Sequence, residues 1–396
     1  MGQKTQTKWT KEMKDELSAC QASDVRDFAD KYGLSFSNCD RKRRKLLEPK
    51  SGYQDKAEKY DINKLLAKRS LWEAIGESFV GAIRAIPDPK HPQLKMSSEG
   101  YDEEEMFSIF SDSQIGAFVS SKETGGLGDY SAKEFDARLS FYQEKLGRIF
   151  QIERSVVPYN RINLFFLGDI IEGSTIFKSQ GRSIDMTTVA QIMKSVDAIT
   201  NLVSWLSTLF CEVGCYCVVG NHGRIGDKGQ NSPMDNLDYL VYKWAEERLS
   251  LHSNVSINIS ESWWMVVERM NTRFCLVHGD DVRSWMNIPF YGADRSEMRM
   301  QKLLKVMFNY YVIGHHHTPA EFSNVIMNGN WVGGSELSLK VMQVGGLPSQ
   351  KLFSVHPDYG ITWHRDILLI DPTKLKPPRT YTSRLKGCAY KQRKTK

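Results

Sequence analysis

Five short polar segments carry the side chain types that divalent cations bind in proteins, and each segment follows a run of apolar residues. In chain order they are Asp112-Ser113-Gln114, Gly168-Asp169-Ile170-Ile171-Glu172, Gly220-Asn221-His222, His278-Gly279-Asp280 and Gly314-His315-His316-His317. Carboxylate, amide and imidazole groups together suit first-row and alkaline-earth ions. A pair of such ions neutralises the charge of a phosphate ester and activates water against it. Any one segment is also typical of a turn or a helix cap, so the hypothesis depends on the series.

The apolar runs before these segments predict the elements that position them. Buried strands are expected at residues 106–110, 163–167, 215–219, 274–277 and 310–313. Helices with one apolar face are expected between them, at 135–149 and 189–206. Ligand-binding side chains of an open α/β sheet gather beyond the carboxyl ends of its strands. The five segments are therefore expected to meet at one edge.

The last part of this region has a different pattern. Asn328-Gly329 favours a tight hairpin turn between strands at 322–327 and 331–342. Further strands are expected at 352–355 and 361–370. Antiparallel strands are therefore expected at the end of the domain.

The series of segments resembles the calcineurin-like metallophosphoesterase superfamily. The pattern of that superfamily is D-x-H, G-D-x-x-D, G-N-H followed by an acidic residue, a lone His, and G-H-x-H. The resemblance covers roughly residues 105–370 and is greatest to phosphoesterases of bacterial viruses and to DNA repair exonucleases. It implies an α/β fold, a four-layer α/β/β/α sandwich, and a phosphoester hydrolase.

The resemblance also implies two divalent ions, Mn²⁺ or Mg²⁺, and a role for each matching residue. One ion would be held by Asp112, Gln114, Asp169 and His317, and the other by Asp169, Asn221, His278 and His315. A hydroxide bridging the two ions would attack the phosphorus. His222 would stabilise the reacting phosphate or protonate the leaving oxygen, and Glu172 would orient the imidazole of His222.

Three positions depart from the superfamily pattern. Gln114 replaces a histidine, and because an amide oxygen is a weaker ligand than imidazole, the first ion is expected to bind loosely. Glu172 replaces an Asp or Asn. Gly223-Arg224 replaces the acidic residue after the third segment, so Arg224 is expected to contact a substrate phosphate, and Lys228 is a further candidate for that role.

Residues 9–47 predict a compact unit of three helices. The stretch resembles a DNA-binding helix-turn-helix, with a turn around Gly33 and a third helix that carries Arg41, Arg43 and Arg44. Lys42 departs from that motif, because it lies near a position that is usually apolar. A plain helical module without DNA-binding function is the alternative interpretation.

Four regions follow from these patterns: a helix-turn-helix-like unit at 1–50, a helical linker at 51–103, a metallophosphoesterase domain at 104–371 and a basic tail at 372–396. Nine Lys or Arg and no acidic residue lie between Lys374 and Lys396, which favours a polyanionic partner such as DNA. A solubilising tail is the alternative. Homodimers are an open expectation, since helix-turn-helix units often bind DNA in pairs.

Composition excludes several other classes. The chain is 41% hydrophobic and 25% charged, as expected of a globular protein, and has no run of about eighteen apolar residues that would indicate a membrane span. Its polar beginning lacks an apolar signal region, so no membrane association and a cytoplasmic location are expected. The seven cysteines show no paired zinc-type spacing.

The resulting prediction is a divalent-metal-dependent phosphodiesterase that acts on DNA as a nuclease. Two alternatives remain open. The first is a phosphomonoesterase or a phosphodiesterase for small nucleotides, because the same fold and ions serve all of these reactions. The second is a DNA-binding accessory protein with a degenerate metal site, for which Gln114 is the sole support.

Overall fold

The computed structural model describes residues 9–21, 23–47, 85–92, 103–176, 180–284, 289–335, 339 and 346–370, with side chains 44, 45 and 47 left out. The chain forms two compact units, Met1–Gly81 and Ala82–Lys396. Most of the predicted linker at 51–103 and the basic tail at 372–396 lie outside the described residues. Within the described residues, no helix is both long enough and apolar enough to cross a membrane.

The larger unit contains a first sheet whose centre is parallel. Its strands are β1 (Glu105–Phe110), β2 (Arg161–Phe166), β3 (Glu212–Cys217), β4 (Val255–Ile259), β10 (Ser349–His356) and β11 (Gly360–Leu368). They lie in the order β11-β10-β1-β2-β3-β4. Strands β1 to β4 run parallel, while β10 is antiparallel to both β1 and β11. The carboxyl ends of β1, β2 and β3 therefore lie at one edge.

The second sheet has the order β5-β6-β7-β9-β8. Its strands are β5 (Trp264–Arg269), β6 (Thr272–Val277), β7 (Tyr310–Ile313), β8 (Ala320–Phe322) and β9 (Val325–Met327). Strands β6, β7 and β9 are parallel to one another, so the loops after β6 and β7 emerge at the same edge, while β5 and β8 are antiparallel to their neighbours.

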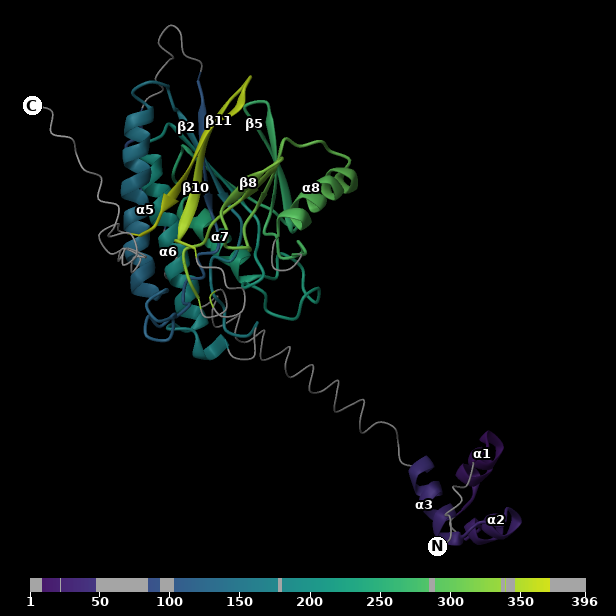
Figure 1. Cartoon of the computed structure of the whole chain (residues 1–396). Coiled ribbons are helices and arrows are strands. Elements are labelled where there is room, and N and C mark those ends of the chain that lie inside the picture. The colour runs from purple at the N-terminus through teal and green to yellow at the C-terminus, as the bar shows by residue number, and fades with distance from the viewer. Residues whose placement is uncertain are drawn as a thin grey trace, which may run out of the picture. The chain divides into compact units, whose positions relative to one another are not determined.

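Helices cover the outer face of each sheet (Figure 1). The first sheet is covered by α5 (Ala132–Glu153), α6 (Thr188–Ser207) and α7 (Leu237–Arg248), and the second by α8 (Phe290–Leu304). The predicted helical stripes fall in α5 and α6, and most of their apolar positions are buried. The predicted four-layer α/β/β/α sandwich is thereby confirmed.

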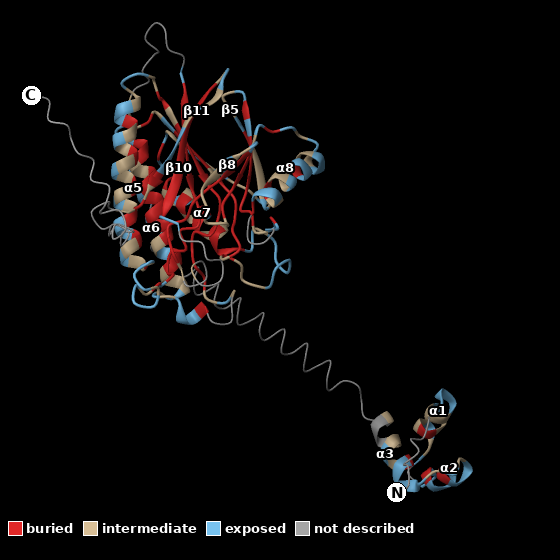
Figure 2. Ribbon diagram, viewed as in Figure 1, coloured by how far each residue is buried: buried red, intermediate tan, exposed pale blue. Residues whose placement is uncertain are grey.

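The central strands of both sheets are buried (Figure 2), and their apolar side chains form one core cluster. Phe107 lies at its centre and is fully buried. Its ring centroid lies 5.4 Å from that of Phe165, 5.2 Å from that of Phe274 and 5.3 Å from that of Phe353. Because these rings come from both sheets, the core sets the distance between the loops that each sheet presents.

The hairpin expected at Asn328-Gly329 is wrong. The residues expected to form one strand at 322–327 form the hairpin themselves, with β8 and β9 antiparallel and a left-handed Ser323 in the turn (φ +46°). Residues 331–335, expected to begin a strand, are not in a strand. Asn328 is fully buried. Its side chain donates to Oγ of Ser111 and accepts from the amide of Lys351, so Asn328 is a polar residue of the core and not part of a turn.

The smaller unit contains the three expected helices: α1 (Lys11–Ala19), α2 (Val25–Lys31) and α3 (Phe36–Leu47). Its core consists of Leu17, Val25, Phe28, Ala29 and Cys39. Gly33 lies between α2 and α3 with φ +62°, a conformation that favours glycine. The helices are confirmed, whereas their helix-turn-helix character and DNA binding stay predictions.

Candidate metal centre

The loops that carry the candidate ligands have a strained backbone. Asp112, Gln114, Asp169, His315 and His317 all have positive φ, between 42° and 63°. A non-glycine residue in this region is uncommon, and such residues cluster at functional sites. Contacts with the surrounding structure therefore hold these five residues in a backbone conformation that is unfavourable on its own.

Glycines let these loops approach one another. A Cβ atom on Gly220 would lie 2.2 Å from both the amide nitrogen and Oδ1 of Asp169. A Cβ atom on Gly314 would lie 2.6 Å from Oδ2 of Asp112. The glycines of the third and fifth segments are thus required by close packing against the carboxylates.

The ring of His278 is oriented by a backbone contact. Its Nδ1 atom lies 2.7 Å from the carbonyl oxygen of Leu167. Because a carbonyl can only accept a hydrogen bond, Nδ1 carries the proton and Nε2 can offer a lone pair. Metal-binding histidines are commonly oriented by such a bond from the other ring nitrogen.

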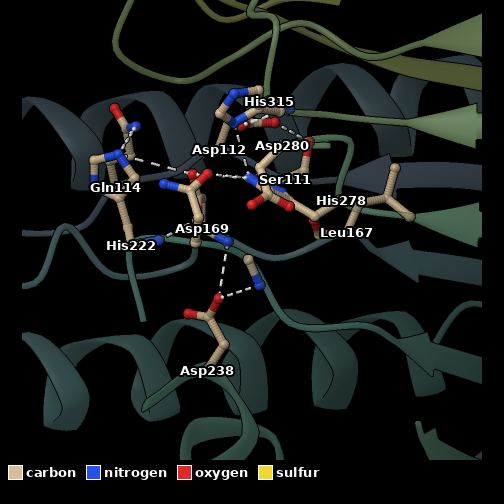
Figure 3. Close-up of polar contacts among 12 residues, drawn as sticks. Ser111, Asp112, Gln114, Leu167, Asp169, His222, Asp238, His278, Asp280 and His315 are labelled. Carbon is tan, nitrogen blue, oxygen red and sulfur yellow. Dashed lines mark hydrogen bonds and ion pairs between the residues drawn. The ribbon is translucent and has the colours of Figure 1, made fainter. Parts of the chain in front are cut away.

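Three further ligand atoms surround Nε2 of His278 (Figure 3). They are Oδ1 of Asn221 at 3.0 Å, Oδ2 of Asp169 at 3.1 Å and Nδ1 of His315 at 3.2 Å. Oδ2 of Asp169 is buried and accepts no hydrogen bond from any described residue. Converging lone pairs around an unsatisfied carboxylate oxygen fit a bound cation.

Electrostatics support the same interpretation. Burial lowers the pKa of His278, but the carboxylate of Asp169 outweighs burial and raises that pKa to about 10. In the absence of a cation, the site therefore draws a proton onto His278. A divalent ion would supply the positive charge in place of that proton.

The residues of the other expected ligand set lie nearby but less tightly together. Oδ1 of Asp112 accepts a hydrogen bond from the amide of His315 at 2.9 Å and lies 3.4 Å from Nε2 of His317. The amide nitrogen of the Gln114 side chain lies 3.3 Å from Nε2 of His222. Asp112 and His317 are thus brought together, whereas the side chain of Gln114 is directed toward His222.

His222 lies in the loop after β3 and contacts Asp169 and Glu172 of the loop after β2. Its amide donates to Oδ1 of Asp169 at 2.8 Å, and its Nδ1 lies 2.9 Å from the carbonyl oxygen and 3.1 Å from Oε2 of Glu172. Burial lowers the pKa of His222, but the charges of Asp169 and Glu172 raise it to about 10. Glu172 is held in turn by Gln180, which donates to it at 2.9 Å.

The predicted substrate-binding side chains have partners within the protein. Nε of Arg224 donates to the carbonyl oxygen of Asn221 at 3.0 Å, so Arg224 supports a ligand-bearing loop. Nζ of Lys228 forms exposed ion pairs with Asp280 at 2.8 Å and Asp281 at 2.5 Å. Substrate contact by Arg224 or Lys228 stays a prediction.

The basic residues of α3 are in different environments. Arg41 is exposed, with Nη2 3.5 Å from Oδ1 of Asn38. Nε of Arg43 donates to the carbonyl oxygen of Cys20 at 2.7 Å, which ties α3 to the end of α1. The side chain of Arg44 lies outside the described residues.

Two sets of supporting residues were not found from the sequence. Oγ of Ser111 donates to Oδ2 of Asp112 at 2.5 Å and accepts from Asn328 at 2.8 Å, within a fully buried polar network. The second is Asp238, which bonds the backbone of the loops after β2 and β3. Neither belongs to a recognised motif, and the Asn-Gly pair at 328 has the composition of a turn.

A family comparison decides the classification of the chain. The model of the calcineurin-like phosphoesterase family matches residues 132–349, which is more than half of the sequence. The chain belongs to the calcineurin-like phosphoesterase family. Members of this family hydrolyse phosphate esters with divalent metals, so this calcineurin-like phosphoesterase is a hydrolase. The converging side chains of Asp169, His278 and His315 provide a candidate metal site.

Several solved structures are similar to this calcineurin-like phosphoesterase at low sequence identity. Vps29 from Entamoeba histolytica, solved with Zn²⁺, is 15% identical, with 66% of this chain and 99% of Vps29 covered and a TM-score of 0.29. A predicted phosphoesterase from Streptococcus pneumoniae is 10% identical, with 67% and 98% covered and a TM-score of 0.24. A hypothetical protein from Pyrococcus horikoshii is 12% identical, with 68% and 90% covered and a TM-score of 0.32. No curated protein matches the sequence significantly.

Proposed function

We propose that this calcineurin-like phosphoesterase hydrolyses phosphodiesters with two divalent ions, Mn²⁺ or Mg²⁺. The observation that carries the proposal is the convergence on Nε2 of His278, where Asp169, Asn221 and His315 lie within 3.2 Å. The degenerate, non-catalytic alternative is disfavoured because this ligand set is complete and His222 lies beside it. Gln114 is not a member of this ligand set.

Two ligand sets would hold the ions, and Asp169 would be shared between them. One set is Asp169, Asn221, His278 and His315, and the other is Asp112, Gln114, Asp169 and His317. Ions held there would neutralise charge on the phosphate and lower the pKa of water. The side chains of the protein hold this arrangement in a buried edge of the sandwich, where electrostatic interactions are stronger than in water.

His222 would act on the reacting phosphate itself. Without bound ions, the charges of Asp169 and Glu172 outweigh burial and raise the pKa of His222 to about 10. When ions neutralise Asp169, the adjacent carboxylate of Glu172 would still favour the protonated imidazole. Glu172 occupies Nδ1, so Nε2, which lies 3.9 Å from Oδ2 of Asp169, faces the ligand set. From this atom His222 can stabilise charge on the phosphate and donate a proton to the leaving oxygen.

DNA is the proposed substrate. The support is the exposed Arg41 and the neighbouring cations on α3, the basic tail of the sequence, and the resemblance of the smaller unit to a helix-turn-helix. Cationic side chains of this kind neutralise backbone phosphates and make binding strongly dependent on salt. A phosphodiesterase for small nucleotides would have no use for such a unit.

Cleavage of DNA tests the proposal directly. End-labelled linear and closed circular DNA are incubated with Mn²⁺, Mg²⁺ or EDTA, using wild type, His222→Ala and His364→Ala. His364 is an exposed histidine paired with Glu321, so it controls for the loss of an imidazole away from the site. Metal-dependent cleavage that is lost only in His222→Ala supports a nuclease. Turnover of bis-p-nitrophenyl phosphate without DNA cleavage would overturn the DNA assignment and keep the phosphodiesterase.

The role of α3 can be separated from catalysis by measuring DNA binding in EDTA. Arg41→Glu is expected to weaken binding and to reduce its salt dependence. Lys11→Glu makes the same charge change at an exposed position on α1 of the same unit. Equal affinities for the two variants would count against α3 as the DNA-binding element.

A further inference from the structure

A buried carboxylate lies behind the candidate metal centre, at the start of α7. Asp238 is the second residue of this helix and is fully buried. The side chain of Asn236 caps the helix by accepting from the amide of Asp238 at 2.8 Å. An acidic group in the first turn of a helix is stabilised by the helix dipole. The helix dipole therefore offsets part of the free energy that burial of the Asp238 carboxylate costs.

The carboxylate of Asp238 accepts hydrogen bonds from two different loops (Figure 3). Oδ2 accepts from the amide of Asp169 at 2.9 Å and from the amide of Gly220 at 3.0 Å. Oδ1 accepts from the amide of Ile170 at 3.1 Å. One side chain thus joins the loop after β2 to the loop after β3.

These amides flank two of the three side chains that converge on His278, those of Asp169 and Asn221. Asp169 provides its own amide, and Gly220 immediately precedes Asn221. Asn236 reinforces the second loop, because its Nδ2 donates to the carbonyl oxygen of Gly220 at 2.9 Å. The start of α7 therefore forms hydrogen bonds with the backbone of Asp169 in one loop and of Gly220 in the other, at or next to the residues that provide the ligand atoms.

We propose that Asp238 is a positioning residue that sets the separation of Asp169 and Asn221 and thereby the affinity of the centre for metal. The inference rests on the proposed function, because it concerns the same site. Buried amides that lose a charged acceptor are left unsatisfied, and the loops must then move to find other partners. Asp169 has φ +52°, a backbone conformation that non-glycine residues rarely adopt, so its position depends on such support.

A purely structural role for Asp238 predicts a different outcome. In that case a substitution would lower the stability of the whole domain and leave the affinity of the folded protein for metal unchanged. Tyr242 offers a matched comparison, since it is buried on the same helix and donates to the carbonyl oxygen of Val218 at 3.1 Å. Val218 precedes the third segment but is not a ligand.

The test measures Mn²⁺ binding to the full-length, metal-stripped protein through the signal of free Mn²⁺ in electron paramagnetic resonance, without any substrate. Asp238→Asn keeps the shape but replaces one acceptor oxygen with a donor, and is expected to lower the affinity roughly 10–100-fold. Tyr242→Phe is expected to bind Mn²⁺ within about twofold of wild type, with thermal unfolding measured in parallel.

Two results would overturn the inference: an unchanged affinity in folded Asp238→Asn, or an equal loss in Tyr242→Phe. If Asp238→Asn does not fold, Asn236→Ala removes the bond to Gly220 together with the cap that positions Asp238. A smaller but measurable loss of affinity is expected, and an unchanged affinity would overturn the proposal. Failure of the proposed function is distinguishable, because it would appear in wild type itself, either as no Mn²⁺ binding or as Mn²⁺ binding without turnover of any phosphodiester.

Discussion

Nε2 of His278 lies 3.1 Å from Oδ2 of Asp169, a buried oxygen that accepts no hydrogen bond within the described part of the chain. The two side chains come from different sheets, since Asp169 follows β2 and His278 follows β6. The aromatic core between the sheets therefore determines whether the two ligands meet. The packing of the two sheets therefore controls the distance between these two ligand atoms.

Gln114→His is expected to strengthen binding of the more weakly held ion. The glutamine amide is directed toward His222, and an imidazole is a better ligand for transition metals than an amide oxygen. Titration calorimetry with Mn²⁺ should show a gain of about tenfold at the weaker of two sites, or about 1.4 kcal/mol. An unchanged weaker site would show that Gln114 is not part of a ligand set.

Gly220→Ala is expected to disrupt metal binding. The added methyl group would lie 2.2 Å from the amide nitrogen and Oδ1 of Asp169, so the two loops must separate. Gly181→Ala is the control, because nothing lies within 4 Å of the added atom and the backbone is not left-handed. Mn²⁺ affinity should fall at least tenfold in Gly220→Ala and stay at the wild-type value in Gly181→Ala. Equal affinities would contradict the close approach of the loops.

Phe107→Ala is expected to destabilise the larger unit by about 3–5 kcal/mol, because the variant leaves a cavity among aromatic side chains of both sheets. Met307→Ala, at a side chain that is 72% exposed, should change stability by less than about 0.5 kcal/mol. Urea unfolding measures both free energies. A loss below about 1 kcal/mol in Phe107→Ala would show that the core is not packed as described.

Glu172→Gln is expected to reduce turnover less than His222→Ala does. The carbonyl oxygen of Glu172 also contacts Nδ1 of His222, so the imidazole keeps part of its orientation when the carboxylate is removed. A loss of kcat of about 10²–10⁴-fold is expected for His222→Ala, the range of general acid catalysis. Kinetics with bis-p-nitrophenyl phosphate at saturating Mn²⁺ compare the variants. A larger effect of Glu172→Gln would assign the central role to the carboxylate.

The sandwich could be predicted because its signals are local. Long apolar runs predicted β1, β2, β6 and β7, and the helical stripes predicted α5 and α6. Parallel strands of one sheet place their following loops at one edge, which is why Asp169 and His222, which follow β2 and β3, could be expected to meet, whereas the approach of His278 depends on the packing of the second sheet. Order along the chain was sufficient for this part of the site.

The support behind the ligands could not be predicted, because it depends on contacts across the fold. Asn328-Gly329 has the composition of a hairpin turn, but tertiary contacts with Ser111 and Lys351 fix Asn328 in the core. In the sequence, Asp238 resembles an ordinary acidic residue near the start of a helix. Its hydrogen bonds from the amides of Asp169 and Gly220 form only when the loops after β2 and β3 fold together. The ion pairs of Lys228 with Asp280 and Asp281 were equally invisible, since they join two separate loops.

Calorimetric titration of Mn²⁺ into the metal-stripped, full-length protein tests the shared metal centre most directly, with wild type compared against Asp169→Asn. Asp169 is the residue that both ligand sets would share. Wild type should bind two ions per chain, and Asp169→Asn should lose affinity at both sites while it remains folded. Absence of saturable binding in wild type, or an Asp169→Asn variant with unchanged stoichiometry and affinity, would contradict a two-ion centre bridged by Asp169.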